Sequence, residues 1–189
     1  MINGKRVLAV VPARGGSRRV PRKNLREYRG KPLVIWAVDH GYASRYIDVL
    51  AISTDDKEIG DMVLSKCFIG GNVNWISVLP RPTELATDTA TSEDVIRHAL
   101  SLHPADWVVL LQPTSPLRTA EDIDACIERA QMGYGCISVS GPFGLTNGAV
   151  YVATAEWLAD HDFSDGGLMK YVMPESRSLD IDIESDFQK

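Results

Sequence analysis

The chain has 189 residues and a mass of 20.8 kDa, with 44% hydrophobic residues, 24% charged residues and a mean hydropathy of -0.09. A chain of this length forms one domain that buries roughly 70% of its unfolded surface, so we expect a single domain over residues 1–189. No apolar run reaches the roughly 18 residues that span a bilayer and residues 1–6 lack the core of a signal peptide, which predicts a cytoplasmic protein. The net charge of -5 argues against a dedicated nucleic-acid binder. The three cysteines, Cys67, Cys126 and Cys136, show no CxxC spacing, so the sequence indicates neither a disulfide framework nor a zinc site.

Short apolar, β-branched runs alternate with segments of helical period along the chain. This alternation is typical of βαβ units, and it predicts an α/β fold with a doubly wound, mainly parallel sheet and helices on both faces. The runs that predict strands are residues 6–12, 49–53, 75–79, 107–111, 136–140, 149–153 and 178–183. The segments that predict helices are residues 32–44, 56–66, 92–102, 120–132 and 155–160.

Local signals mark the ends of several elements. Three predicted helices begin with a capping-box spacing, in which a short polar side chain and an acid three residues later satisfy free N–H groups. The pairs are Asp55 with Glu58, Thr91 with Asp94, and Thr119 with Asp122. A turn is predicted at Gly141, Pro142 and Gly144, and residues 162–167 are typical of a loop.

The most informative segment covers residues 10–24, VVPARGGSRRVPRKN, where a strand ends in a glycine-containing loop rich in cations. Glycines let backbone N–H groups approach a phosphate, and the loop after a first strand lies at the carboxyl edge of an open sheet, where ligands bind. The segment contains neither GxxxxGK[ST] nor GxGxxG, which disfavours P-loop NTPases and dinucleotide-binding oxidoreductases. The loop therefore predicts a polyphosphate site, with a polar turn of exposed arginines as the structural alternative.

Charge is distributed unevenly along the chain. Residues 5–31 hold ten of the twenty basic residues and one acid, whereas residues 175–186 hold five acids and one base. Two solvated ends of opposite charge would give this pattern. Alternatively, the two ends fold together around one ligand.

The loop sequence resembles the acylneuraminate (CMP-sialic acid) cytidylyltransferases, with the related CMP-Kdo synthetases and other nonulosonate cytidylyltransferases. The family begins with a strand followed by PARGGSK and P.KN, and residues 12–17 with Pro21, Lys23 and Asn24 match, while Arg18 stands in place of the lysine. Further family motifs follow in order over nearly the whole chain: residues 52–55 (ISTD), 81–82 (RP), 85–88 (LATD), 91–92 (TS), 111–118 (LQPTSPLR), 147–151 (NGAVY), and Arg177 with 180–182 (DID).

The resemblance implies a Rossmann-like fold of the nucleotide-diphospho-sugar transferase type and a nucleotidyltransferase activity. The reaction would transfer CMP from CTP to the anomeric hydroxyl of an acidic 2-keto sugar, sialic acid or a related nonulosonate, and release pyrophosphate. The residues implied for nucleotide binding are Arg14, Gly15, Gly16, Ser17, Lys23, Asn24, Arg81 and Ser92. Those implied for catalysis are Arg14, Lys23 and Asp182, and those implied for the acceptor sugar are Gln112, Asn147 and Tyr151.

Each of these side chains also has an ordinary structural explanation when taken alone. Arg81 would be a surface cation, and Ser92 a helix cap. Gln112 would belong to a turn at a strand end, and Tyr151 to the core.

Asp180 and Asp182 stand at alternating positions, so in an extended strand both side chains project to one face. Hard oxygen ligands suit Mg²⁺ bound to phosphate, although two acids in a strand are more often a solvated edge. The resemblance assigns both residues to one or two Mg²⁺ ions, which would bring the acidic end of the chain to the basic loop. An aspartate or a metal-bound hydroxide would serve as the general base.

The chain departs from the family at residues 140–146, where members carry a longer dimerisation element that supplies basic residues to the sugar carboxylate. No Lys or Arg lies between Arg129 and Lys170. The carboxylate partner would then be Arg177, Lys170, Arg118 or a residue of another subunit. Homodimerisation stays open, and so do two alternative functions: a nucleotidyltransferase for another acceptor or nucleotide, and a non-catalytic CTP-binding protein. We expect no nucleic-acid or membrane partner.

Overall fold

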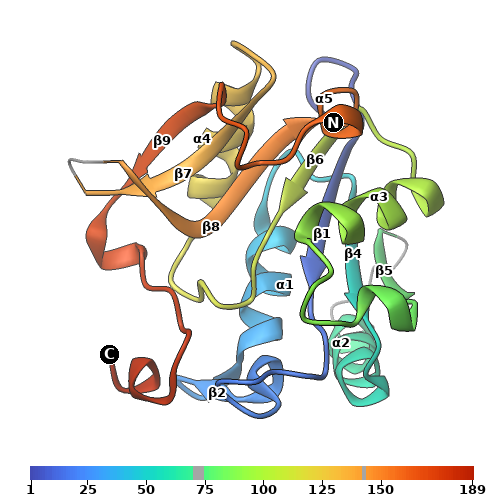
Figure 1. The fold of residues 1–189 in the computed structure, drawn as a ribbon, viewed down its shortest axis with the longest axis vertical. Coiled ribbons are helices and arrows are strands. Elements are labelled where there is room, and N and C mark those ends of the chain that lie inside the picture. The colour runs from blue at the N-terminus through green and yellow to red at the C-terminus, as the bar shows by residue number, and fades with distance from the viewer. Residues whose placement is uncertain (70–74, 142–143) are drawn as a thin grey trace.

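The computed structural model describes residues 1–69, 75–141 and 144–189, and within them seven strands form one sheet (Figure 1). The turn expected at Pro142 and the side chain of Cys67 lie outside the described part of the chain. The strand order across the sheet is β5-β4-β1-β6-β8-β7-β9. The bounds are β1 Val7–Pro12, β4 Val49–Thr54, β5 Ile76–Pro80, β6 Trp107–Leu110, β7 Gly135–Ser140, β8 Leu145–Thr154 and β9 Met169–Met173. A separate two-stranded ribbon joins β2 Glu27–Tyr28 to β3 Lys31–Pro32.

The sheet is mainly parallel, as predicted. β1 pairs in parallel with both β4 and β6, β4 pairs in parallel with β5, and β7 with β9. β8 runs antiparallel to its neighbours β6 and β7. The carboxyl ends of β1, β4 and β6 therefore meet at one edge, which is where ligands bind in open sheets of this kind.

Helices cover both faces of the sheet and bury two apolar cores. One core packs α1 (Leu33–Ala43), α2 (Lys57–Ile69) and α4 (Ala120–Ala130) against one face, and the other packs α3 (Ser92–Leu102) and α5 (Trp157–Asp160) against the opposite face. Alternate residues of β1 enter the two cores, because side chains of a strand point to opposite faces in turn. The doubly wound α/β fold is thus confirmed. Within the described residues, no helix is long and apolar enough to cross a membrane.

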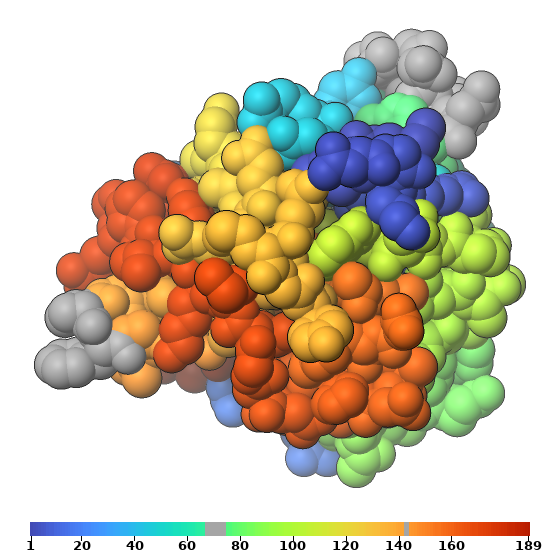
Figure 2. All heavy atoms as spheres, turned by 90° about the horizontal axis from the view of Figure 1, so that it is seen from above, coloured from blue at the N-terminus to red at the C-terminus, as the bar shows by residue number. Residues whose placement is uncertain are grey.

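Ion pairs hold the first residues of the chain at the amino end of the strands. The Met1 ammonium donates to Oδ1 of Asp48 at 2.8 Å, and Lys5 pairs with Asp106 at 3.1 Å. Figure 2 shows the first residues packed beside the segments near residues 45 and 105 at this end of the molecule. The opposite end of the sheet carries the basic loop.

Two caps confirm the sequence analysis and one corrects it. Thr91 with Asp94 and Thr119 with Asp122 form the expected capping boxes. At α2 the cap is Asp56, whose Oδ1 accepts hydrogen bonds from the N–H groups of Glu58 and Ile59 at 2.9 and 3.3 Å. The expected cap Asp55 is one residue too early, and its carboxylate serves the basic loop instead.

The last predicted strand was wrong, and the predictions missed one strand of the seven-stranded sheet, β9, as well as the two short strands β2 and β3. Residues 178–183 join no sheet: Ile181 donates to the carbonyl of Thr114 at 2.8 Å and packs with Tyr28 and Leu33 in a small separate core. This one-sided burial explains the alternating pattern that suggested a strand. β9 was missed because it is an edge strand on which Val172 and Met169 are exposed, so its pattern is weak.

The close approach of β7 to β8 at Gly135 predicts a strong packing effect. A Cβ added at Gly135 would collide with the carbonyl oxygen of Val152 and lie 2.9 Å from Cα of Ala153. Gly135→Ala should therefore lower the free energy of unfolding by about 1–3 kcal/mol, measured by urea denaturation. Gly133→Ala is the matched control, because its new Cβ would only meet Cγ of Met169 at 3.9 Å. Equal stability of the two variants would contradict the packing described for Gly135.

Candidate active site

A cavity of about 500 Å³ opens at the carboxyl edge of β1 and β6. Four segments far apart in the sequence form its walls: the loop after β1, residues 81–95, the turn after β6, and the C-terminal segment. Nine of the residues predicted for the site line it: Arg14, Gly16, Ser17, Lys23, Asn24, Arg81, Ser92, Gln112 and Asp182. The fold thus gathers most of the predicted nucleotide site in one place.

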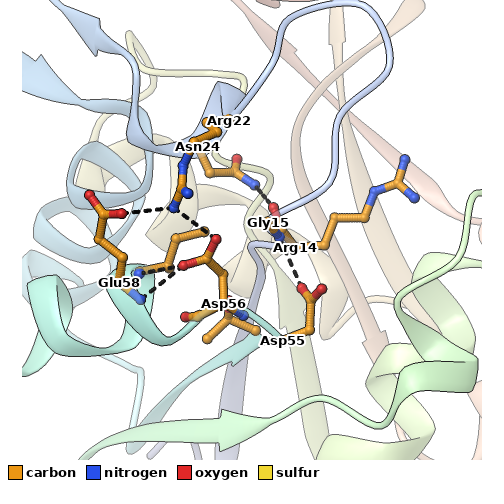
Figure 3. A network of polar contacts seen from close by, with 9 residues as sticks. Arg14, Gly15, Arg22, Asn24, Asp55, Asp56 and Glu58 are labelled. Atoms are coloured by element: carbon orange, nitrogen blue, oxygen red, sulfur yellow. Dashed lines mark hydrogen bonds and ion pairs between the residues drawn. The ribbon is translucent and has the colours of Figure 1, made fainter.

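Two acids after β4 anchor the basic loop (Figure 3). Asp55 accepts a hydrogen bond from the Gly15 N–H at 2.9 Å. The side chain of Arg22, a residue with a left-handed φ of 53°, donates to Asp56 and to Glu58, both at 2.9 Å. A Cβ on Gly15 would lie 2.6 Å from Oδ2 of Asp56, so glycine is required for this close approach. Gly15 does not line the cavity and shapes the loop around it.

Arg14 points away from that anchor and is held by a third acid. Its guanidinium donates to the carbonyl of Thr87 at 2.8 Å and to Oδ1 of Asp88 at 2.6 Å, and Arg18 pairs with the second oxygen of Asp88. These hydrogen bonds and charges, Arg14 first, lower the pKa of Asp88. Asp88 also lines the cavity, so a carboxylate lies among the cations predicted to bind phosphate.

The basic and acidic ends of the chain fold together. This is the second of the two explanations given for the uneven distribution of charge. Asp182 pairs with Lys23 at 3.2 Å and with Arg19 at 2.8 Å, and the Lys23 ammonium also donates to the carbonyl of Ile181 at 3.0 Å. Figure 1 shows the C-terminal end of the chain near β2, where the Tyr28 hydroxyl donates to the carbonyl of Lys189 at 2.8 Å. The alternative of two separately solvated ends is wrong.

Three further predicted residues complete the wall of the cavity. Arg81 is only 8% exposed and donates to the hydroxyl and carbonyl oxygens of Ser53, at 3.0 and 2.8 Å, so it is not a surface cation. Burial lowers the pKa of Arg81 to about 10, which leaves it charged at neutral pH. Asn24 donates to the carbonyl of Arg14 at 2.9 Å. Ser92 is the first residue of α3, where free N–H groups and the helix dipole favour an anion.

A second cavity of about 270 Å³ adjoins the first. Ser92 and Gln112 line both cavities, so the two spaces meet at these side chains. Tyr151 lines the second cavity with its ring 5.1 Å from that of Phe163. Burial, with the charges of Asp180 and Glu93, raises the pKa of Tyr151. Gln112 and Tyr151, two of the residues predicted for the acceptor, thus both line this second cavity.

Two predicted residues lie away from both cavity walls. Asn147 is 6% exposed, and its side chain accepts from the Ser138 hydroxyl at 2.6 Å and donates to Oγ of Ser178 at 3.1 Å. Asp180 lies behind Gly148, at which a Cβ would be 3.4 Å from both Oδ2 of Asp180 and Oε1 of Gln112. The structure thus brings Asp182 to the cavity and does not place Asp180 or Asn147 on its wall.

None of the three basic residues considered for the sugar carboxylate lines either cavity in the described structure. Arg118 is fully buried and donates to the carbonyls of Gln112 and Ala149 at 2.7 and 2.8 Å, and burial lowers its pKa to about 9. Arg177 pairs with Asp122 at 2.7 Å, and Lys170 lies on the edge strand β9. Arg118 thus joins the turn after β6 to β8, and Arg177 joins the C-terminal segment to α4.

In a comparison with known protein families, the family model described as cytidylyltransferase matches residues 8–139 of this chain. The chain belongs to the cytidylyltransferase family. The resemblance inferred from the loop sequence and the later motifs is confirmed.

Curated relatives of this cytidylyltransferase include two named enzymes. The CMP-N,N'-diacetyllegionaminic acid synthase of Legionella pneumophila is 30% identical over 96% of this chain and 93% of its own length. That alignment covers 226 positions, so the relative has residues without counterparts among the 189 here. The N-acylneuraminate cytidylyltransferase of Escherichia coli is 28% identical over 97% of this chain, which spans about half, 51%, of that protein.

Solved structures agree on the fold of the cytidylyltransferase. CMP:2-keto-3-deoxy-manno-octonic acid synthetase complexed with CTP superposes with a TM-score of 0.70 at 14% identity, covering 97% of this chain and 95% of the other. Rv0371C of Mycobacterium tuberculosis in complex with manganese superposes with a TM-score of 0.65 at 16% identity, covering 97% of this chain and 96% of the other. At such identities the likeness concerns the fold alone.

Several side chains that organise the site were not predicted. Asp56 and Arg22 hold the loop, and Asp88 holds Arg14. The available signal was that Asp88 ends the matched motif 85–88 and Asp56 directly follows the matched motif 52–55, in a chain whose first loop has a surplus of cations. Sequence alone does not show which acid meets which cation.

Replacing Asp88 tests whether an internal carboxylate competes with phosphate for Arg14 and Arg18. Asp88→Asn keeps the Oδ1 acceptor for Arg14 and removes the negative charge from the cavity. We expect inorganic triphosphate to bind roughly two- to fivefold more tightly, measured by isothermal titration calorimetry. Glu84→Gln removes an exposed acid of the same segment that does not line the cavity and should leave the affinity unchanged. Weaker binding in Asp88→Asn would show that the carboxylate is needed to position Arg14.

Proposed function

We propose that this protein transfers CMP from CTP to the anomeric hydroxyl of an acidic 2-keto sugar of the nonulosonate type and releases pyrophosphate. The observation that carries the proposal is the pair of adjoining cavities, which meet at Ser92 and Gln112. Cations line one of them, and the other is lined by Gln112, Tyr151 and, as its one charged group in the described structure, Glu93. The names of the relatives support this choice of reaction, since two of them refer to CMP-sugar synthesis or to cytidylyl transfer to N-acylneuraminate.

The larger cavity suits a nucleoside triphosphate. Arg14 and Lys23 lie on its wall and would neutralise the charge that develops on the phosphates during transfer. Gly16 and Ser17 offer backbone and hydroxyl donors to phosphate oxygens. Asn24, Arg81 and Ser92 would contact the cytidine. Burial and hydrogen bonds hold Asn24 and Arg81 in place before the ligand arrives.

The smaller cavity suits the acceptor. Gln112 has an amide at the junction of the two spaces, and Tyr151 presents a flat ring with a polar tip. An acceptor held there would direct its reacting hydroxyl toward the larger cavity. Positioning of two reactants side by side supplies a large share of catalysis in phosphoryl transfer, and the protein needs no nucleophile of its own.

We propose that Asp182, on the wall of the larger cavity, holds Mg²⁺ beside the phosphates together with Asp180, which precedes it by two residues and lies off that wall. Among the described residues, no group of three or more His, Cys, Asp or Glu side chains is placed to hold a metal ion. Two carboxylates fit Mg²⁺, which takes its other ligands from phosphate and water. Loss of hydration, and then the charge of Asp182, raise the pKa of Asp180, and a cation would relieve this repulsion. When bound, the ion would add positive charge at the phosphates.

The test is pyrophosphate release from CTP with Mg²⁺ and a panel of sialic, legionaminic, pseudaminic and Kdo acids. UTP, ATP and GTP in the same assay identify a nucleotidyltransferase for another nucleotide. CTP binding by calorimetry without turnover on any acid identifies a non-catalytic CTP-binding protein. Either result would overturn the proposal.

Replacement of Lys23 tests the proposed phosphate site most directly. Lys23→Ala should lower kcat by about 100-fold or more, because it removes a cation aimed at developing charge. Lys57→Ala is the matched control, since Lys57 is exposed on α2 and pairs only with Asp61 in the described structure. Full turnover of a folded Lys23→Ala protein would remove the role assigned to this residue.

Asp182 tests the metal proposal. Asp182→Asn should raise the Mg²⁺ concentration needed for half-maximal pyrophosphate release at least tenfold, and EDTA should stop the reaction of the unchanged protein. Glu184→Gln serves as the control, because Glu184 pairs with Arg26 and does not line the cavity. An unchanged Mg²⁺ requirement in Asp182→Asn would exclude Asp182 as a ligand.

A further inference from the structure

The two adjoining cavities differ in the sign of their charge. Five cations line the larger one: Arg14, Arg18, Arg19, Lys23 and Arg81. In the described structure, the smaller cavity is lined by one charged side chain, that of Glu93. The space assigned to an acidic sugar therefore contains an acid and no base.

Glu93 is the second residue of α3, directly after Ser92 at the junction of the cavities. Its Oε1 accepts a hydrogen bond from the Phe163 N–H at 3.1 Å. No described residue donates to its Oε2. The negative charge of Glu93 also acts on Tyr151 across the cavity, where it helps to raise the pKa of the tyrosine. One carboxylate oxygen thus holds the cavity wall, while the other keeps its capacity to accept a hydrogen bond.

The chemistry of a 2-keto acid fixes how it can lie in these two spaces. Its carboxylate is attached to the anomeric carbon that carries the reacting hydroxyl, so the carboxylate stays close to the nucleotide when that hydroxyl reacts. Near the nucleotide, the cations of the larger cavity would attract this carboxylate, whereas Glu93 would repel it in the smaller cavity. The carbons remote from the anomeric centre then occupy the smaller cavity, and the missing base in that cavity is explained.

We infer that Glu93 determines acceptor specificity by accepting, through Oε2, a hydrogen bond from an O–H or N–H group on the part of the sugar remote from the anomeric carbon. The acceptor class is an acidic sugar whose remote end carries hydroxyl or acylamino groups. The inference rests on the proposed function. It adds a residue that neither the motifs nor the resemblance assigned.

Glu93→Gln separates this role from a structural one. Glutamine keeps an oxygen for the Phe163 N–H and removes the charge that strengthens a hydrogen bond from the sugar. The KM for the best acceptor of the panel should rise about tenfold, while the KM for CTP stays within about twofold and Tm is unchanged. Glu121→Gln is the matched control, because Glu121 is the second residue of α4 after the same kind of capping threonine and lines neither cavity.

The outcomes are distinct. An unchanged KM for the acceptor in Glu93→Gln, with normal turnover of the unchanged protein, would overturn the inference and leave the proposed function standing. A lower Tm with equal rises in both KM values would show that Glu93 only holds the wall of the cavity. Absence of turnover by the unchanged protein on every acid would instead overturn the proposed function.

Discussion

The pairing of Asp182 with Lys23 and Arg19 joins the two ends of the chain, and the candidate site depends on it. Each pair is partly exposed and contributes little stability alone. The two ends are also held together because Ile181 is buried against Tyr28 and Leu33. Burial of this apolar surface contributes more free energy than the exposed ion pairs do. Without this closure, the larger cavity would lose the wall that carries Asp182, and Lys23 would lose both of its partners.

The site is organised before any ligand arrives, because acids hold most of its cations in place. Asp56 fixes Arg22, Asp88 fixes Arg14 and Arg18, and Asp182 fixes Lys23. Arg81 is fixed differently, by burial against the oxygens of Ser53. Such preorganisation limits the rotamer entropy that long basic side chains lose on binding.

The sequence predicted the layers of the fold and most of the cavity, because apolar periodicity and ordered motifs report on the sheet and on the loop after β1. It did not predict the choice between Asp55 and Asp56 as the cap of α2, since adjacent acids share the same local signal. It placed Asn147 at the acceptor, whereas its amide is satisfied by Ser138 and Ser178, partners that only the tertiary fold brings near. The alternation of residues 178–183 was real, but it reflects burial on a small separate core rather than pairing in a sheet.

The carboxylate of Asp88 among the cations has a consequence for ionic strength. A bare cationic cavity attracts counterions from solution, and a polyphosphate that enters must release them, which makes affinity fall steeply with salt. Here Arg14 and Arg18 already have an internal counterion, so binding of a polyphosphate would exchange one anion of the protein for one of the ligand. Fewer ions would be released to solution, and the affinity for phosphate would depend less on the salt concentration.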